Sequence, residues 1–375
     1  MGTVRGMRRG AVSRLAASGG VAAGRPPPPA PTPEQQVDQI ASFVEAARGH
    51  TFTTRPAVEF LSDAAFRADV LANLDASATD VEADDVAFTA LGWIAPDQDL
   101  FELYKIAFGG GVVGFYDPTT KVLEVRGTDL TPYRREVIAH ELTHALDDQV
   151  LGLSGLTSTG LVDEHYLAAL VAVEGSASKV QQRYVDSMSD LERAQDLIEQ
   201  LQLSSDPALL TLPITLLTLT SAPYLRGVTF EQDLIDRLGN PAGPDLSLTR
   251  LPATTEQAFD TDTYLADQPA VPVATPPADG PVVTSGPWGQ FLLTLLLREG
   301  IALDTVDPAT HGWAGDAYVT WTSGGQSCLR LDTRMDDPAA ASTLEAPLAG
   351  WGTRPPGATV VTAAPDTVRL TSCAG

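Results

Sequence analysis

The segment Val137-Ile-Ala-His-Glu-Leu-Thr-His-Ala-Leu-Asp-Asp-Gln149 decides the fold of this 375-residue chain. Its apolar residues recur at helical spacing, which predicts a helix with one core-facing stripe. The stripe consists of Val137, Ile138, Leu142, Ala145 and Leu146. Thr131 can cap this helix, and Pro132 is tolerated in its first turn because the missing N–H of proline costs nothing there. We therefore expect the helix to begin near residue 131.

The motif His140-Glu-Leu-Thr-His144 lies on this predicted helix. Residues four apart differ by about 40° in azimuth and one turn in height, so His140 and His144 can bind the same cation. Glu141 projects in another direction, so its carboxylate can take a proton from a water that the cation activates. The pattern predicts one zinc ion per chain, with Glu141 as the general base.

A third ligand is expected because hydrolytic zinc sites usually have three protein ligands and one open position. A second helix is predicted from about Asp163, a good N-cap, to Tyr184, and Glu174 interrupts its apolar stripe. An isolated buried carboxylate is costly unless it is paired or binds a metal. A mid-helix glycine costs about 1 kcal/mol relative to alanine, so Gly175 indicates that another helix approaches there. We therefore expect Glu174 to be the third ligand. The alternatives are Asp148, Asp163 and His165.

A short β-hairpin is predicted just before the motif. Residues 111–116 and 121–126 have strand character and flank Asp117-Pro-Thr-Thr120, a turn sequence with proline where a φ near −65° is needed.

Composition divides the chain into four parts. Residues 1–33 are rich in arginine and then in proline, which predicts a disordered leader or a weak export signal. Residues 34–260 have mostly helical patterns, 261–287 form a Pro-rich connection, and 288–375 combine one helix with strand-like runs. The expected class is α+β, with a mainly helical domain that includes the hairpin and a small mixed α/β C-terminal portion. Its tryptophans are expected to pack in the core, namely Trp288, Trp313 and Trp321.

The formal net charge is −24, and 43% of the residues are hydrophobic. Such a charge repels phosphate backbones and anionic lipids, so nucleic acids and membrane surfaces are not expected partners. No stretch is long and apolar enough to predict a membrane span. The sequence does not indicate an oligomeric state.

The two cysteines, Cys328 and Cys373, lie in segments with strand character. They can form one disulfide if the two strands are neighbours, or remain two core thiols. A disulfide would fit an extracellular or cell-surface protein, and a cytoplasmic protein is the alternative.

The chain resembles the gluzincin branch of HExxH metallopeptidases. Residues 137–149 resemble the active-site helix of that branch, and Ala172-Val-Glu-Gly-Ser-Ala177 resembles the helix that carries its glutamate ligand. Three other stretches are similar to segments of bacterial, often exported, members. These are Gly114-Phe-Tyr-Asp-Pro118, Pro252-Ala-Thr-Thr-Glu-Gln257 and Gly312-Trp-Ala-Gly-Asp316.

The resemblance implies a zincin-like catalytic domain over residues 34–260, with zinc on His140, His144 and Glu174 and with Glu141 as the base. It also implies that the strand near 121–126 presents an edge to an extended peptide substrate.

One position departs from the pattern of the branch. Thermolysin-like members have an aspartate four residues after the ligand glutamate, which orients a histidine, and Ser178 stands there. Asp148 or Asp163 are the possible substitutes. No position matches the tyrosine or histidine that stabilises the oxyanion in such enzymes. The candidates for that role are His165, Tyr166, Tyr116 and His311.

These observations make a zinc metallopeptidase acting on peptides or proteins the leading hypothesis. Two others remain: a zinc hydrolase with a non-peptide substrate, and a non-catalytic binding protein that zinc stabilises.

Overall fold

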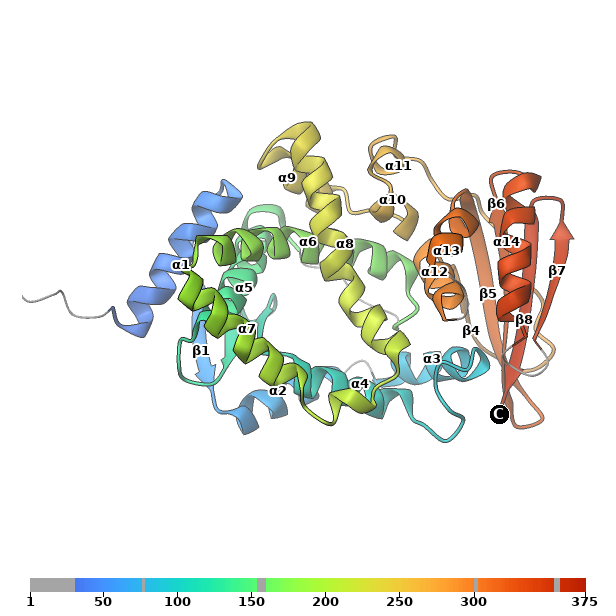
Figure 1. Ribbon diagram of the computed structural model, residues 1–375, viewed down its shortest axis with the longest axis horizontal. Coiled ribbons are helices and arrows are strands. Elements are labelled where there is room, and N and C mark those ends of the chain that lie inside the picture. Colours follow the sequence, from blue (N-terminus) through green and yellow to red (C-terminus); the bar gives the residue numbers. More distant parts are fainter. Residues whose placement is uncertain (1–30, 76–77, 154–159, 300–302, 354–357) are drawn as a thin grey trace, which may run out of the picture.

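The structure is a computed structural model that describes residues 31–75, 78–153, 160–299, 303–353 and 358–375. The chain is α+β, as expected: a mainly helical part holds a three-stranded sheet, and the C-terminal part holds a five-stranded sheet (Figure 1). The predicted leader lies outside the described residues except for its last three, of which Thr32 caps the first helix.

The helical part extends to residue 265. Its elements are α1 (Pro33–Arg48), β1 (Ala57–Leu61), α2 (Asp63–Asp75), α3 (Ala78–Ala90), α4 (Leu100–Gly111), β2 (Gly114–Asp117), β3 (Val122–Arg126), α5 (Pro132–Leu151), α6 (Glu164–Ser187), α7 (Asp190–Ser204), the 3-10 helix η1 (Leu209–Thr211), α8 (Ile214–Leu238), α9 (Ala242–Thr249), α10 (Thr255–Phe259) and α11 (Thr261–Leu265).

The C-terminal part follows. Its elements are β4 (Val282–Gly286), α12 (Gln290–Arg298), α13 (Leu303–Thr310), β5 (Trp313–Ser323), β6 (Gln326–Met335), α14 (Pro338–Trp351), β7 (Thr359–Ala364) and β8 (Thr367–Ala374).

The small sheet has the strand order β1-β3-β2. β2 and β3 form the predicted antiparallel hairpin, and β1 pairs with β3 in parallel. The expectation that the strand near 121–126 presents a free edge is therefore wrong, because β3 is central and paired on both sides. The edge strands are β1 and β2, and β2 is the one that contacts Glu141 of α5. A parallel partner that comes more than 60 residues earlier leaves no local signal in the sequence.

The two predicted helices are confirmed with their caps. Thr131 accepts a hydrogen bond from Arg134 N at the start of α5, and Asp163 accepts one from Tyr166 N at the start of α6. The stripe of α5 packs on the small sheet and on α1, in a core that includes Ile138, Ala139, Leu142, Leu146, Leu123, Val125, Ile40 and Val44. This packing holds the motif helix against β2 and β3.

The helix that approaches Gly175 is α8, which crosses α6 (Figure 1). A Cβ on Gly175 would lie 2.6 Å from the carbonyl oxygen of Gly227, and a Cβ on Gly227 would lie 2.5 Å from Gly175 Cα. Two glycines thus allow backbone contact between the helices next to Glu174. The close approach expected at Gly175 is confirmed.

The C-terminal sheet is antiparallel, with the order β4-β5-β6-β8-β7. Cys328 on β6 pairs with Cys373 on β8, and the two form a disulfide, which confirms the first of the two alternatives for the cysteines. Trp288, Trp313 and Trp321 are buried, as predicted. The core that contains Trp288 and Trp313 also includes residues of α3 and α4, so it crosses the Pro-rich connection.

Within the described part of the chain, no helix combines the length and the apolar character needed to cross a membrane.

Candidate metal centre

Three predicted ligands meet between α5 and α6. The Nε2 atoms of His140 and His144 lie 3.0 Å apart. Oε2 of Glu174 lies 3.1 Å from Nε2 of His140 and 3.4 Å from Nε2 of His144. Among the described residues, these three are the group of histidine, cysteine and carboxylate side chains that can hold a metal ion, with all ligand atoms within 4.8 Å of one another.

The separations suit a small cation. Zinc bonds of about 2.0–2.1 Å in a tetrahedral arrangement would place ligand atoms about 3.3 Å apart, and the three observed separations are 3.0, 3.1 and 3.4 Å. Two imidazoles and one carboxylate are ligands that zinc prefers. The residues therefore fit a zinc ion with one open position.

The charges of the cluster also favour a cation. Burial alone would lower the pKa of His144, but the carboxylate of Glu174 outweighs burial and raises the pKa of His144 to about 9. Burial would raise the pKa of Glu174, but the two imidazoles hold it well below its usual range. The site thus requires a positive charge beside Glu174, which either a proton or a metal ion can supply, so metal binding releases protons.

The partner of His140 is a residue that the sequence did not indicate. Nδ1 of His140 lies 2.9 Å from Oε1 of Gln181, whose Nε2 donates to Oε1 of Glu136 at 3.3 Å. Because the amide oxygen can only accept, Nδ1 of His140 carries a proton, and Nε2 is the ring atom that can bind a metal ion. Gln181 lies seven residues after Glu174 on α6, so both are on one helix face. This two-turn spacing is the feature of the sequence that could have identified Gln181.

The proposed substitutes for the missing aspartate are both wrong. Oδ2 of Asp148 accepts hydrogen bonds from the hydroxyl of Tyr116 at 2.8 Å and from Nζ of Lys121 at 2.5 Å. Asp163 caps α6, about three turns before Glu174. Neither residue therefore acts as the third ligand or supports a histidine.

The last turns of α5 are buried rather than exposed to solvent at Asp147. Asp147, which is 1% exposed, forms an ion pair with Arg48 of α1 at 2.7 Å and accepts a hydrogen bond from Ser176 of α6 at 2.7 Å. These bonds tie α5 to its neighbours one turn beyond His144.

Glu141 lies beside the ligands but outside the metal-binding group. Its Oε2 accepts a hydrogen bond from Tyr116 N of β2 at 2.9 Å, and burial raises the pKa of its carboxyl group. Gly114 allows β2 to lie so close, because a Cβ there would be 2.7 Å from Cγ1 of Val137. The edge strand thus holds the carboxylate that the motif predicts as a base.

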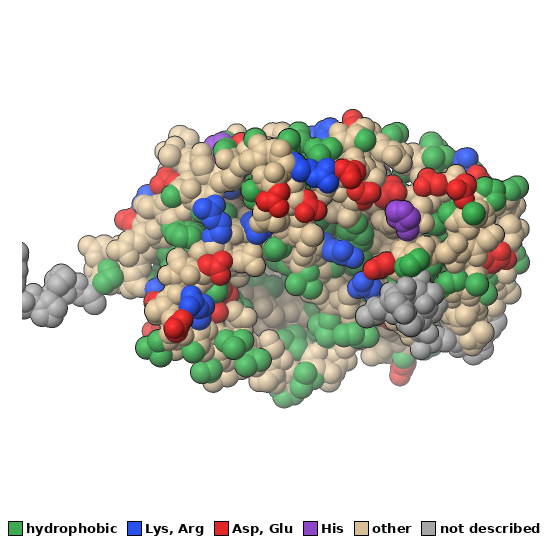
Figure 2. All heavy atoms as spheres, turned by 45° about the horizontal axis from the view of Figure 1, so that its top comes forward, with side chains coloured by type: hydrophobic (Ala, Val, Ile, Leu, Met, Phe, Trp, Pro, Cys, Tyr) green, Lys and Arg blue, Asp and Glu red, His purple; other side chains and the backbone are tan. Residues whose placement is uncertain are grey.

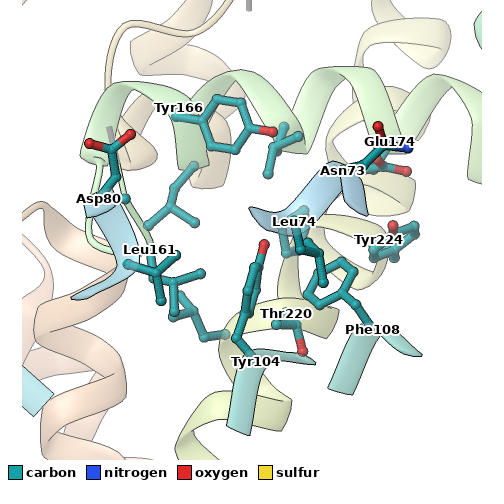
Figure 3. Close-up of a pocket in the computed structure, with 16 residues that line it drawn as sticks. Asn73, Leu74, Asp80, Tyr104, Phe108, Leu161, Tyr166, Glu174, Thr220 and Tyr224 are labelled. Carbon is teal, nitrogen blue, oxygen red and sulfur yellow. The ribbon is translucent and has the colours of Figure 1, made fainter. Parts of the chain in front are cut away.

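Tyr224 of α8 is a further residue of the site that the sequence did not reveal. Its ring stacks on that of His140, with centroids 5.8 Å apart and planes 30° apart. The charge of Glu174, followed by burial, raises the pKa of Tyr224, so the phenol remains protonated and can donate a hydrogen bond. Figure 3 shows Tyr224 near Glu174. The sequence feature that could have pointed to Tyr224 is Gly227, which lies three residues after it on the same helix. Nothing in the sequence showed that Gly227 contacts Gly175.

The other tyrosines and histidines proposed for the oxyanion lie elsewhere. Tyr116 uses its hydroxyl to bond Asp148, and Nδ1 of His165 bonds the carbonyl oxygen of Ala253 at 2.8 Å. His311 follows α13 in the C-terminal part, is exposed and lines none of the described pockets at the cluster. Tyr166 lines a pocket that adjoins Glu174.

Three connected hollows surround the cluster and share the side chains of Phe108 and Tyr224, with volumes of about 470, 400 and 280 Å³. His140 and Glu141 line the two smaller ones, and Glu174 lines the largest and the smallest. The cluster is thus bordered by three hollows.

Comparison of the chain with protein-family models, curated proteins and solved structures returned no match. The proposed function therefore rests on the geometry of the site.

Proposed function

We propose that the protein is a zinc-dependent hydrolase, and specifically a peptidase of the gluzincin type. The observation that carries the proposal is the meeting of three ligand atoms at 3.0–3.4 Å with the buried carboxylate of Glu141 beside them. His140, His144 and Glu174 would hold one zinc ion. When bound, the ion supplies Lewis-acid chemistry, which acidifies water and polarises a carbonyl group.

The residues of the chain would divide the remaining work. Glu141 takes a proton from the attacking water and passes it to the leaving amine, and Tyr116 N holds the carboxylate in place. The Tyr224 hydroxyl donates to the oxygen on which negative charge develops. Gln181 fixes the tautomer of His140.

The peptide-substrate assignment rests on the open cleft and on the edge strand β2. Tyr116 N points away from β3, toward Glu141, so the same edge of β2 faces the cluster. An extended peptide can lie along such an edge with its carbonyl group near the ligands. On the face shown in Figure 2, lysines and arginines are scattered among acidic residues, so this view offers no basic surface for a nucleic acid.

The disulfide between Cys328 and Cys373 supports an extracellular or cell-surface location, because disulfides persist in oxidising compartments. A cytoplasmic protein would keep these cysteines reduced. Free-thiol titration of the protein isolated from its native host distinguishes the two.

The first experiment measures zinc per chain by inductively coupled plasma mass spectrometry after purification without added metal. We expect about one zinc in the wild type, little in Glu174→Ala, and about one in the control Asp148→Asn, whose side chain lies outside the cluster. A zinc-free, folded wild type would contradict the proposed metal centre.

The second experiment assays Glu141→Gln on a peptide library. The variant should keep its zinc and lose turnover by at least about 10²-fold, because a general base contributes about 10²–10⁴-fold. Turnover at the wild-type rate would exclude Glu141 as the base. A zinc-loaded wild type that cuts no peptide would favour a non-peptide substrate or a zinc-stabilised binding protein.

A further inference from the structure

A further hollow, of about 730 Å³, lies where the start of α6 meets the C-terminal sheet. It is larger than each of the three hollows at the cluster, and none of the proposed metal ligands lines it. Its wall includes residues 283–287, which contain most of β4, and residues 162–166 at the start of α6. Helix α3, which contacts β4 at this junction (Figure 1), adds Asp80 and Ala83. The hollow is therefore distinct from the proposed active site.

The free edge of β4 borders this hollow. Within the described part of the chain, β4 is the last strand of its sheet and pairs with β5 alone. The backbone N and O atoms of Thr284 lie 3.1 and 3.3 Å from Oγ1 of Thr320 on β5. Successive residues of a strand direct these groups to opposite sides, so the N–H and carbonyl groups of Ser285 point away from β5. Ser285 is exposed and lines the hollow, and no described backbone group bonds it.

The edge carries none of the side chains that usually keep other strands away. Charged residues and prolines on an edge strand hinder the addition of a further strand. Strand β4 consists of Val282-Val-Thr-Ser-Gly286, and both valines are exposed. Its pairing with β5 is irregular between Val282 and Ser285 and regular at Ser285 and Gly286. The regular end is thus the part of the edge on which an extended segment can pair.

The lining of the hollow is acidic. Asp80 and Asp163 line it, and none of the described lining residues is a lysine or an arginine. Burial, with a smaller contribution from the charges of Asp80 and Asp163, raises the pKa of the nearby Asp84 to about 7. Residues 76–77 and 154–159 contain no charged side chain. A segment with lysines or arginines would complement this charge, whereas an acidic segment would be repelled.

We propose that the hollow beside β4 is a second polypeptide-binding site, which binds a basic, extended segment by adding it as a strand to the free edge of β4. Backbone hydrogen bonds to the edge hold such a segment, and every second side chain points to the same face of it. Lysines or arginines at alternate positions would therefore face the carboxylates of the hollow. The site goes beyond the proposed hydrolase and does not depend on the metal centre.

Ser285 and Asp80 are the residues through which the site can be tested. Ser285→Pro removes the outward N–H but no bond to β5, and proline is tolerated on an edge strand where its nitrogen faces outward. The matched control is Ser285→Ala, which keeps the N–H. Asp80→Asn removes one charge from the hollow, and its control is Asp190→Asn on α7, where the aspartate side chain is 98% exposed and lies outside the hollow.

The probe is a fluorescein-labelled octapeptide with blocked ends in which lysine alternates with valine. Its binding is measured by fluorescence anisotropy on Glu141→Gln protein, so that the peptide is not cut. The Kd should be about 10-fold lower than that of the same peptide with glutamate in place of lysine. Adding Ser285→Pro should raise the Kd about 10-fold, because one backbone hydrogen bond is lost. Adding Asp80→Asn should raise it about 3-fold. The two control substitutions should leave it unchanged.

Hydrogen exchange locates the bound peptide without any substitution at the edge, so the test holds even where Ser285→Pro does not fold. The lysine peptide should slow exchange in residues 282–286 and leave β7, the other edge strand of the sheet, unchanged.

Three results would overturn the inference. Equal affinity for the lysine and glutamate peptides, or binding of neither, would exclude a site for basic segments. Binding without protection of residues 282–286 would exclude strand addition to β4. Spermine that binds as tightly as the lysine peptide would reduce the site to a general attraction for cations. None of these results bears on the metal centre, because zinc content and turnover are measured separately.

Discussion

The crossing of α6 and α8 allows a quantitative test in the variant Gly175→Ala. The new Cβ would lie 2.6 Å from the carbonyl oxygen of Gly227 and 2.8 Å from its Cα and carbonyl carbon. Optimal carbon contacts are about 3.5–4.0 Å, so the helices must separate by about 1 Å or distort. Because the obstacle is backbone, no rotamer change can relieve it.

The magnitude follows from two opposing effects. Overpacking of this kind costs about 1–3 kcal/mol. Alanine in place of a mid-helix glycine returns about 1 kcal/mol. We therefore expect Gly175→Ala to lower the free energy of unfolding by up to about 2 kcal/mol. The control is Gly350→Ala on α14, where no atom lies within 4 Å of an added Cβ, and we expect it to gain up to about 1 kcal/mol.

The same displacement should reach the site, because α8 carries Tyr224 and α6 carries Glu174. A misplacement of about 1 Å can reduce turnover about 10²-fold. We expect Gly175→Ala to keep its zinc and to lose turnover 10- to 100-fold. Urea denaturation, zinc analysis and peptide assays measure the three quantities. A Gly175→Ala variant as stable as Gly350→Ala and fully active would show that the two helices do not need glycine at their crossing.

Three further variants test individual side chains. Tyr224→Phe should reduce kcat by about 10²–10³-fold with KM and zinc content little changed, since it removes one donor to the developing charge; equal loss of binding and turnover would instead indicate a packing role. Gln181→Ala should weaken zinc affinity about 10–100-fold, measured by competition with a chelator, because His140 loses the acceptor that fixes its tautomer, and unchanged affinity would refute that role. Burial raises the pKa of Glu231, which accepts a hydrogen bond from Ser247, to about 8. The neutral carboxyl group therefore stabilises the fold fully below pH 4.5, and this contribution is lost as the pH rises through about 8. The loss is at most about 5 kcal/mol at about 1.4 kcal/mol per pKa unit. Between pH 5 and pH 8, the free energy of unfolding measured in urea should therefore fall less in Glu231→Gln than in the wild type. An equal fall in both proteins would exclude Glu231 as its source.

The amino-acid sequence alone determined the local part of the site. The apolar spacing of residues 137–146 sets which face of α5 is buried, and the four-residue interval then brings His140 and His144 together on that helix. Glu174 was recognisable because a carboxylate in an apolar stripe needs a cationic partner, and the structure brings it to the two histidines. The turn between β2 and β3 was likewise readable from its proline and polar residues.

Only the tertiary structure decided which distant segments complete the site. Tyr224 reaches His140 because α8 crosses α6 at Gly227, 52 residues beyond Gly175, and the sequence shows two helical glycines without showing that they meet. Asp147 is buried because Arg48 comes from α1, and β3 is central because β1 joins it in parallel. Helical and strand periodicities describe the face that one element buries. They do not reveal which other element packs on that face, because this depends on the packing of the whole chain.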